Sequence, residues 1–440
     1  MTNRLFLVSA LIFLSIACSN KEESFGETEI TKWQYGKNGA ISLTYDDGSI
    51  NQFRKALPIM NRLEFPGTFF ILTGAIPGSE YQGKFIGRPV ETIIKETASI
   101  PTNKENFFER ASAAGFLGYE GTIEYHSNAG GLYEAGKVEE AYKVMDDLYQ
   151  KVRNGKFKPG SKPSNEVLEA KGISWDDIRK YAEQGHEFAS HTITHPRLAV
   201  LDEVNMLYEL EKSKEDIKKQ LGEKYTFSAE GPYGTEDERV MEYAYKIYPA
   251  LRNRMPEPFL EELNRSSKAL PGASEKEYVQ WQRGALSKTP YDLMKSWVDT
   301  TAASDNVWLV LVFHGVDGIG WEALTSERLD EYFQYMKAKE DKLWVATFGD
   351  VAKYMREREN AKVGVAKESN KIHINLNHSL DKKWYNIPLT LKTYVSPDWK
   401  EVQVKQGDKD QKVQSSEDEK GTYILYQAIP NEKPVELSRA

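Results

Sequence analysis

The sequence predicts an α/β protein in which a parallel sheet carries a partly helical insertion and is followed by a separate all-β domain. Short apolar runs, each closed by a turn residue, alternate with segments of helical periodicity, and this pattern is typical of a parallel sheet, open or closed. Over about residues 76–163 glycines become frequent and apolar residues recur at helical spacing, which indicates an insertion. After residue 366 apolar and polar residues alternate, which favours a β-sandwich.

The elements follow in chain order. The first strand ends at Gly48, and further strands are expected at residues 67–74, 187–190, 225–229, 247–251, 279–286, 308–313 and 344–348. Helices are expected at residues 51–63, 175–184, 203–221, 289–300 and 350–358. Pro58 indicates a kink in the first helix, and Ser174 is the expected N-cap of the second. A polar linker after residue 358 leads to strands near residues 372–376, 387–391, 402–405 and 422–427.

Composition places the chain among soluble globular proteins. Its 440 residues are 40% hydrophobic and 28% charged, enough for two or three domains with a sizeable core. The formal net charge is −8 and the sequence pI is about 5.6. Since a general nucleic-acid binder normally shows a basic patch, no nucleic-acid partner is expected.

The N-terminal segment predicts export. Arg4 precedes a short apolar run, which is the pattern of a signal peptide over residues 1–17. Ser15-Ile16-Ala17-Cys18 resembles a bacterial lipoprotein signal, which makes Cys18, the one cysteine, the expected lipidation site and residues 18–34 a tether. The polar residues 19–24 resemble a tag for display on the outer-membrane surface. An ordinary secretory signal with a chance cysteine is the alternative.

Two adjacent carboxylates, Asp46 and Asp47, end the first strand. In parallel sheets this end of a strand is where ligands and chemistry collect. Two close carboxylates repel, so one of them is expected to need a cation or a proton. The alternative is a plain turn, because Asp-Gly is a common turn pair.

Histidines follow two other predicted strands. His191 and His195 are four residues apart, but β-branched residues lie between them and Pro196 disfavours a helix, so a strand-end loop is expected. His314 ends the apolar strand at residues 308–313. If the three strand ends converge, two histidines and one carboxylate are available for a metal such as zinc, and the remaining pair for proton transfer. Isolated surface or structural histidines are the alternative.

Four segments, in order, resemble signature motifs of the polysaccharide deacetylase family, carbohydrate esterase family four. They are Thr44-Tyr45-Asp46-Asp47-Gly48, His191-Thr192-Ile193-Thr194-His195, Pro232-Tyr233-Gly234 and Val310-Leu311-Val312-Phe313-His314. Several ordered motifs are more specific than any one of them. The resemblance implies a distorted (β/α) barrel over residues 35–362, interrupted by the insertion. The alternating pattern, and not the resemblance, predicts residues 366–440 as an accessory β-sandwich.

The resemblance also implies roles for single residues. Asp46 would be the general base, His314 the general acid, and the backbone N–H of Tyr233 a donor to the oxyanion. Asp47, His191 and His195 would hold Zn²⁺ or another divalent transition metal. The implied activity is metal-dependent removal of acetyl groups from N- or O-acetylated carbohydrate by an enzyme that is lipid-anchored at the cell envelope.

Two features depart from the family pattern. Glu230 stands two residues before the Pro-Tyr pair, where the family usually has an arginine that steadies the base, and a carboxylate there would disfavour the ionised base. Arg283 is the expected substitute; otherwise Glu230 points away or the base is retuned. The family's Asp-containing motif is not clear either, and Asp292 or Asp299 would serve near His314.

Other functions stay open at this level. The same residues fit an acetyl esterase acting on a polymer such as xylan. A catalytically weak or inactive, surface-anchored carbohydrate binder is a second possibility, favoured by Glu230, and a structural envelope lipoprotein is a third. The β-sandwich either binds glycan or caps the barrel, and of these two roles we expect capping. His126, in the insertion, is expected to be an exposed histidine without a role.

We predict that the mature chain begins at a lipidated Cys18 and lacks residues 1–17, because the signal pattern ends at that cysteine. Mass spectrometry of the native N-terminal peptide measures this. An unmodified Cys18, or cleavage at another bond, would contradict the prediction.

Overall fold

A computed structural model describes residues 24–235 and 237–440. The chain forms two compact units, one of residues 32–360 with 380–387, and one of residues 361–379 and 388–440 with the segment up to residue 31. The predicted signal peptide and Cys18 lie outside the described residues. Among the described helices, none has the length and apolar character needed to cross a membrane.

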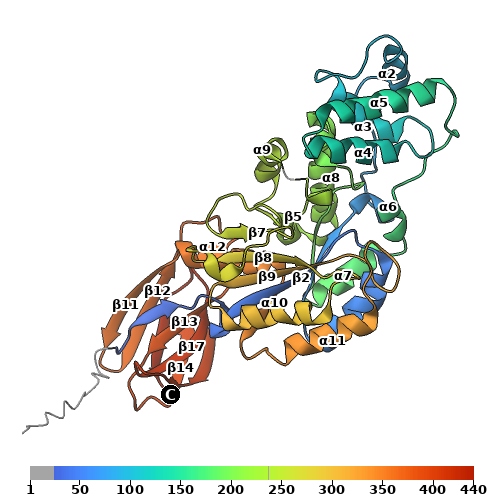
Figure 1. Cartoon of the computed structure of the whole chain (residues 1–440). Helices are drawn as coiled ribbons and strands as arrows, with labels where there is room; N and C mark the ends of the chain where they lie inside the picture. The colour runs from blue at the N-terminus through green and yellow to red at the C-terminus, as the bar shows by residue number, and fades with distance from the viewer. Residues whose placement is uncertain (1–23, 236) are drawn as a thin grey trace, which may run out of the picture. The chain divides into compact units, whose positions relative to one another are not determined.

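The larger unit is built on a parallel sheet. Its strands are β2 (Gly39–Tyr45), β3 (Thr68–Ile71), β4 (Glu187–Ser190), β5 (Ser228–Ala229), β6 (Ala250–Leu251), β7 (Glu261–Leu263), β8 (Val279–Gly284), β9 (Val307–Phe313) and β10 (Leu343–Val345). Their order is β6-β5-β4-β3-β2-β9-β8-β7, and β10 pairs with the first half of β2. The sheet curls into a half-barrel with helices around it, which confirms the predicted distorted (β/α) barrel (Figure 1).

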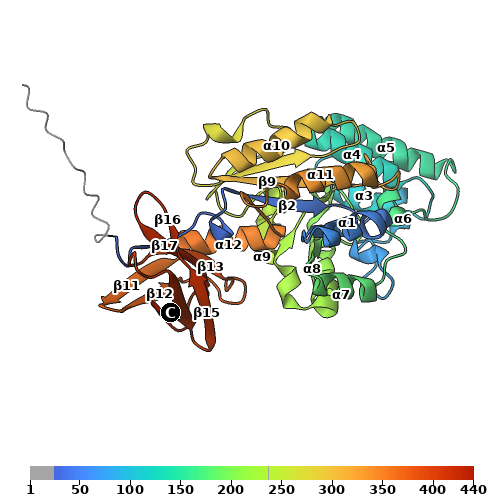
Figure 2. The same cartoon turned by 90° about the horizontal axis from the view of Figure 1, so that it is seen from below.

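Helices cover the outer side of this sheet. They are α7 (Trp175–Glu183), α8 (Glu203–Leu221), α9 (Glu238–Ile247), α10 (Tyr291–Ala303), α11 (Ser326–Lys337) and α12 (Phe348–Asn360). α10 contacts β2, β9 and α11, and α7 and α8 contact β4 (Figures 1 and 2). Ser174 caps α7 as predicted, in a capping box with Asp177.

The helix predicted at residues 51–63 is divided. Residues Gln52–Ala56 form a π-helical turn, and α1 (Leu57–Arg62) follows with Pro58 in its first turn. Proline has no N–H to donate and its ring collides with the carbonyl four residues earlier, so the preceding turn widens. The widened turn keeps Gln52 buried against the end of β2.

Aromatic packing makes the end of β2 rigid. The ring of Tyr45 is fully buried and stacks between Phe69 and Phe313, with centroids 5.2 and 5.0 Å apart. These three rings come from the neighbouring strands β2, β3 and β9. The residues that follow Tyr45 therefore leave a firmly packed core.

The insertion is helical and has a core of its own. Its helices are α2 (Val90–Glu96), α3 (Phe107–Ala113), α4 (Ile123–Glu134) and α5 (Val138–Arg153). A further helix, α6 (Asn165–Glu169), lies just beyond the predicted boundary at residue 163 and is described with the insertion. α2 to α5 are grouped at one end of the unit (Figure 1). Buried residues such as Phe107, Met145 and Tyr149 fill the space between them. Val200, which lies outside the insertion in the segment after β4, packs into the same cluster.

The smaller unit is the predicted β-sandwich, made of two antiparallel sheets. One consists of β1 (Thr28–Ile30), β13 (Leu389–Tyr394), β17 (Thr422–Ala428) and β16 (Ser416–Glu417). The other consists of β11 (Lys362–Glu368), β12 (Lys371–Asn377), β18 (Val435–Arg439), β14 (Glu401–Gln406) and β15 (Lys409–Gln414).

Two parts of this unit differ from the sequence prediction. Residues 28–30, assigned to the tether of residues 18–34, pair with β13 as strand β1. Residues 362–368, assigned to a polar linker, form strand β11. Both are edge strands, in which side chains face solvent, so neither shows the apolar pattern that predicts a strand.

Glu357 on α12 supplies a pH dependence of stability. It is fully buried, and its carboxylate accepts a hydrogen bond of 3.0 Å from the backbone N–H of Ile387. Burial raises the pKa of Glu357 from 4.5 to about 7. Between those values the folded state binds more protons than the unfolded state, so stability is highest below the lower value and is lost as the pH rises through the higher one.

We therefore predict that Glu357→Gln, which keeps the acceptor but does not titrate, flattens the pH dependence of the free energy of unfolding. The wild type should lose up to about 3 kcal/mol relative to the variant between pH 4.5 and pH 8. Denaturant unfolding of both proteins across this range measures the difference. Parallel curves for the two proteins would show that Glu357 does not titrate in this interval.

Candidate active site

Polar residues follow the C-terminal ends of five parallel strands and meet in one buried cluster. Asp46 and Asp47 follow β2, His191 follows β4, and His314 follows β9, as the sequence predicted. Glu230 follows β5 and Arg252 follows β6. Because the sheet curls, the ends of β2 and β6 come together although three strands separate them in the sheet.

The structure brings the three predicted metal ligands together. Oδ1 of Asp47 lies 3.2 Å from Nε2 of His195 and 3.5 Å from Nε2 of His191. The three ligand atoms all lie within 4.8 Å of one another, and all three residues are buried. One carboxylate oxygen and two imidazole nitrogens form a donor set that suits zinc and other divalent transition metals. The described residues thus contain a site that fits a metal.

The loops that hold these ligands and Tyr233 have an unusual backbone. Asp47, Thr192, His195 and Tyr233 have φ values of 71°, 71°, 64° and 62°, and they are four of the nine non-glycine residues with positive φ in the described chain. Such residues cost of order 1–3 kcal/mol each and persist where their surroundings hold them. The Oγ1 of Thr192 accepts a hydrogen bond from the N–H of His195, which holds this loop closed.

Asp46 is held by an arginine that the sequence analysis did not identify. Nη2 of Arg252 donates to Oδ2 of Asp46 at 2.8 Å, and Nη1 donates to Oδ1 of the same carboxylate. Arg252 is fully buried and also donates to Thr44. The expectation for Arg283 was wrong, because its guanidinium donates to backbone carbonyls of residues 264 and 282 instead.

Glu230 has a defined place in this cluster. Its Oε1 lies 2.9 Å from Nη2 of Arg252 and accepts a hydrogen bond of 2.6 Å from Asn253. Its Oε2 lies 2.8 Å from Nδ1 of His191, leaving Nε2 of that histidine toward Asp47. Burial raises the pKa of Glu230, but the charges of Arg252 and His191 outweigh it and lower that pKa. Nδ1 of His191 also lies 3.0 Å from the backbone carbonyl of Glu230, so the main chain and the carboxylate of Glu230 together fix the orientation of this predicted metal ligand.

The charges of the cluster favour a divalent cation. Three buried carboxylates, Asp46, Asp47 and Glu230, face one buried guanidinium, Arg252, and the charge of Arg265 also acts on Glu230, so negative charge stays in excess when the histidines are neutral. Burial raises the pKa of Asp47, but hydrogen bonds from His191 and His195 hold it well below its usual range. An ionised Asp47 is the form that binds metal.

His191 couples metal binding to pH. Burial lowers its pKa, but the charge of Glu230 and the hydrogen bond with Asp47 raise it well above its ordinary value. A metal ligand must be a neutral imidazole, so metal binding at His191 would displace a proton, and we expect metal affinity to rise with pH.

His314 lies beside the predicted base. Its Nε2 is 3.4 Å from Oδ2 of Asp46, and the Gln52 amide donates to the backbone carbonyls of both residues, at 2.8 Å and 2.5 Å. Burial lowers the pKa of His314 more than the two aspartates raise it. Asp292 and Asp299 do not approach His314, since they pair with Lys295 and Lys339 on exposed helix surfaces. Nδ1 of His314 is buried and has no hydrogen-bond partner among the described residues.

Two exposed aromatic rings border the site. Trp321 is 52% exposed and meets His314 edge-on, with centroids 4.7 Å apart. Tyr233 is 38% exposed and lies over His195, with centroids 4.6 Å apart. The oxyanion role of the Tyr233 N–H stays a prediction. No pattern in the sequence marked Trp321, which lies in a loop after β9.

The insertion also contributes to the site. Oε2 of Glu166, on α6, lies 3.9 Å from Nδ1 of His195. His126 is not exposed as predicted: it is 3% exposed, its Nδ1 lies 2.9 Å from the Ala111 carbonyl, and its Nε2 accepts a hydrogen bond from the N–H of Arg197. Burial lowers the pKa of His126 to about 4, so it is a neutral packing residue.

Comparisons with known proteins agree with this geometry. Residues 150–247, which include His191, His195 and Tyr233, match the family model for polysaccharide deacetylase. Over these residues the chain is similar to polysaccharide deacetylases, a class of hydrolases that act on acetylated carbohydrate.

Individual relatives are distant. A gellan lyase from a Bacillus species is 26% identical over 278 residues, which is 59% of this chain but 11% of the relative, so the chain spans a small part of that protein. The peptidoglycan deacetylase PdaC from Bacillus subtilis is 13% identical, with 75% of this chain and 96% of that one covered and a TM-score of 0.34. PdaA from Bacillus subtilis, a family 4 carbohydrate esterase, is 12% identical, with 75% and 86% covered and a TM-score of 0.32.

The contacts of Arg252 predict that Arg252→Lys lowers turnover by about 10- to 100-fold, because an ammonium keeps the charge but cannot hold Asp46 with two parallel hydrogen bonds. Arg283→Lys is the matched control, since that guanidinium donates to backbone carbonyls away from the cluster. Steady-state kinetics and thermal unfolding of both variants measure the effect. Equal turnover for Arg252→Lys and the wild type would show that Asp46 does not depend on this pair.

Proposed function

We propose that this protein is a metal-dependent hydrolase that removes acetyl groups from carbohydrate, with Asp46 as the general base and His314 as the general acid. The observation that carries the proposal is the position of this acid–base pair, 3.4 Å apart, beside the Asp47, His191 and His195 cluster. A pure binding protein has no need of a proton acceptor and donor next to a metal site.

The side chains fit the steps of acetyl hydrolysis. A divalent metal, for which Zn²⁺ is our first candidate, would act as a Lewis acid that activates water and polarises the acetyl carbonyl. Asp46, oriented by Arg252, accepts the proton of the attacking water. The N–H of Tyr233 donates to the oxyanion, and His314 gives a proton to the departing nitrogen or oxygen. Since burial lowers the pKa of His314, the alkaline limb of the rate profile is expected at a lower pH than for an ordinary histidine.

The proposed substrate is an N- or O-acetylated polysaccharide or oligosaccharide. The exposed ring of Trp321 supports this, because aromatic faces suit the apolar faces of sugars. The gellan lyase match covers 11% of that protein, so its activity is not transferred to this chain.

We further propose a location at the cell envelope, with a lipid on Cys18 anchoring the protein to a bacterial membrane, and the outer-membrane surface as the more specific site. The signal pattern of residues 1–17 supports the anchor, and the polar residues 19–24 support surface display.

The alternative of an inactive, surface-anchored carbohydrate binder has lost its main support. It rested on Glu230 in place of the usual family arginine. Arg252 supplies the missing guanidinium from the next strand, and Glu230 instead contacts His191. The hydrolase is therefore the function that the site supports best.

The test is acetate release from chitooligosaccharides, peptidoglycan and acetylated xylan, combined with metal analysis. We predict that Asp46→Asn keeps its metal but lowers turnover about 100-fold or more, the usual scale for a lost general base. His195→Ala should lose both activity and stoichiometric metal, because one of three protein ligands is gone. Acetate release from chitooligosaccharides or peptidoglycan would indicate amide hydrolysis. Acetate release from acetylated xylan would indicate ester hydrolysis.

Replacement of His126 by Gln is the control, since His126 is a buried histidine whose ring nitrogens face backbone groups outside the metal cluster. It should retain metal and activity. Near-normal acetate release by Asp46→Asn would exclude Asp46 as the base, and equal metal content in His195→Ala and wild type would exclude the proposed metal site.

A further inference from the structure

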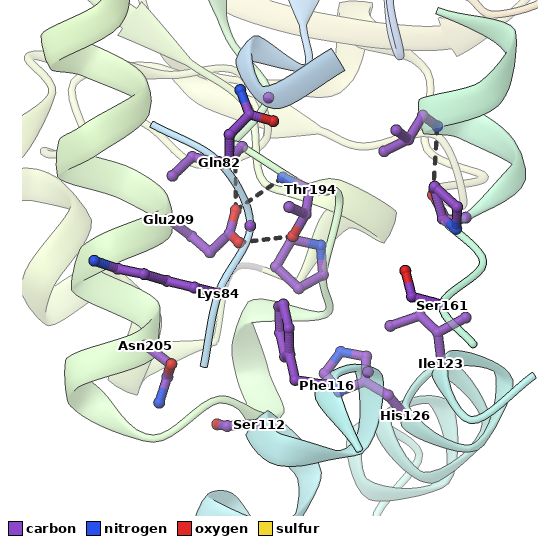
Figure 3. A pocket seen from close by; sticks show the side chains of 18 of the residues that line it. Gln82, Lys84, Ser112, Phe116, Ile123, His126, Ser161, Thr194, Asn205 and Glu209 are labelled. Atoms are coloured by element: carbon purple, nitrogen blue, oxygen red, sulfur yellow. Dashed lines mark hydrogen bonds between the residues drawn. The ribbon is translucent and has the colours of Figure 1, made fainter. Parts of the chain in front are cut away.

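A pocket of about 450 Å³ lies on the other side of the loop that carries His191 and His195. Figure 3 shows residues of the insertion on one side of it, such as Phe116 and Ile123, and Thr194 of the loop opposite. Several of its polar side chains already have partners: Ser112 accepts from the Asp202 N–H, and Asn205 bonds the backbone of Ile86. The hydrogen bonds in the pocket wall indicate that side chains of this wall hold the loop of His191 and His195 in place.

Glu209 on α8 accepts three hydrogen bonds from this loop. Its Oε2 accepts hydrogen bonds from the N–H groups of Ile193 and Thr194, at 2.8 and 3.0 Å, and its Oε1 accepts one of 2.6 Å from the Thr194 hydroxyl. The carboxylate is 4% exposed. Figure 3 shows it turned toward Thr194. It therefore satisfies two neighbouring backbone donors between the two metal-ligating histidines.

One helical turn further on, Ser213 supports the start of the same loop. Its hydroxyl donates to the Thr192 carbonyl at 3.3 Å and lies 2.7 Å from the hydroxyl of Ser190. Ser190 in turn accepts a hydrogen bond from the Thr192 N–H. Because residues four apart share one face of a helix, α8 presents Glu209 and Ser213 to the loop together.

This support is needed because the loop is strained. Thr192 and His195 both have left-handed backbones, and the two N–H groups between them point to Glu209 and away from the metal cluster. Without an acceptor these buried donors would turn toward water or other partners, and the loop would relax from the conformation that aims both imidazoles at Asp47.

We propose that Glu209 is a positioning residue of the metal site, which acts through the Ile193-Thr194 backbone to hold His191 and His195 in ligating geometry. This inference rests on the metal site of the proposed function. It assigns to α8 a second role besides covering β4.

The helix offers a matched control. Asp216, on the same buried face of α8, accepts hydrogen bonds from two backbone N–H groups, those of Glu80 and Tyr81, at 2.8 and 3.1 Å. It thus makes the same kind of bond as Glu209, but to the segment that leads into the insertion. Loss of Asp216 should destabilise the fold without moving the metal ligands.

The experiment measures Zn²⁺ affinity of the full chain by competition with a chromophoric chelator. Glu209→Met keeps the length and removes all acceptors, and it should weaken Zn²⁺ binding about 10- to 100-fold. Glu209→Gln should restore most of the affinity, because its amide oxygen accepts from both N–H groups and its NH₂ donates to the Thr194 hydroxyl. Asp216→Leu should leave the affinity unchanged. The absorption spectrum of bound Co²⁺ should change in Glu209→Met alone, since it reports ligand geometry.

Thr194→Val decides the question if Glu209→Met does not fold, since it removes one of the three bonds and is expected to weaken Zn²⁺ binding by a smaller factor. If Glu209→Met folds and binds Zn²⁺ with wild-type affinity, the proposal is overturned. If Glu209→Met does not fold, wild-type Zn²⁺ affinity in Thr194→Val overturns it. An equal loss in Asp216→Leu would overturn it too, because the effect would then be general. A wild type without Zn²⁺ uptake would refute the metal site itself, whereas a metal-binding wild type with unaffected variants refutes the role of Glu209.

Discussion

The ion pair between Arg252 and Asp46 is the interaction on which the rest of the site depends. Three buried carboxylates stand at the strand ends, and Arg252 contacts two of them, Asp46 and Glu230. Isolated buried charges cost several kcal/mol each, so this arrangement persists only because the guanidinium lies between them. Arg252 reaches Asp46 across three intervening strands, which requires the curl of the sheet. The charges of the site can therefore be balanced only if the sheet is curved.

The division of labour among the carboxylates follows from their partners. Asp46 is paired with a guanidinium and lies next to His314, which suits proton transfer. Asp47 faces two imidazoles and suits a metal. Glu230, which looked like a defect when only the motif was considered, contacts His191 on the side away from Asp47. Similar groups acquire different chemistry because each has a different neighbour.

The insertion belongs to the site and is more than a decoration on the barrel. Oε2 of Glu166 on α6 lies 3.9 Å from Nδ1 of His195. This contact places α6 beside one of the predicted metal ligands. In the barrel itself, α8 and the strained histidine loop provide the rigidity that a metal site requires.

The sequence by itself determined the strand–helix alternation, the β-sandwich and the residues that follow apolar strands, such as Asp46, His191 and His314. Those predictions rest on local periodicity, which reports where a strand ends. Only the tertiary structure decided which charges meet. Arg252 follows the strand predicted at residues 247–251, but its partner lies 206 residues away, and nothing in the local sequence identifies that partner. Arg283 lies in a clear strand pattern, but its guanidinium donates to backbone carbonyls and lies over the ring of Trp281, away from Asp46. Side-chain direction and sheet curvature decide what a side chain reaches, and neither is a local property.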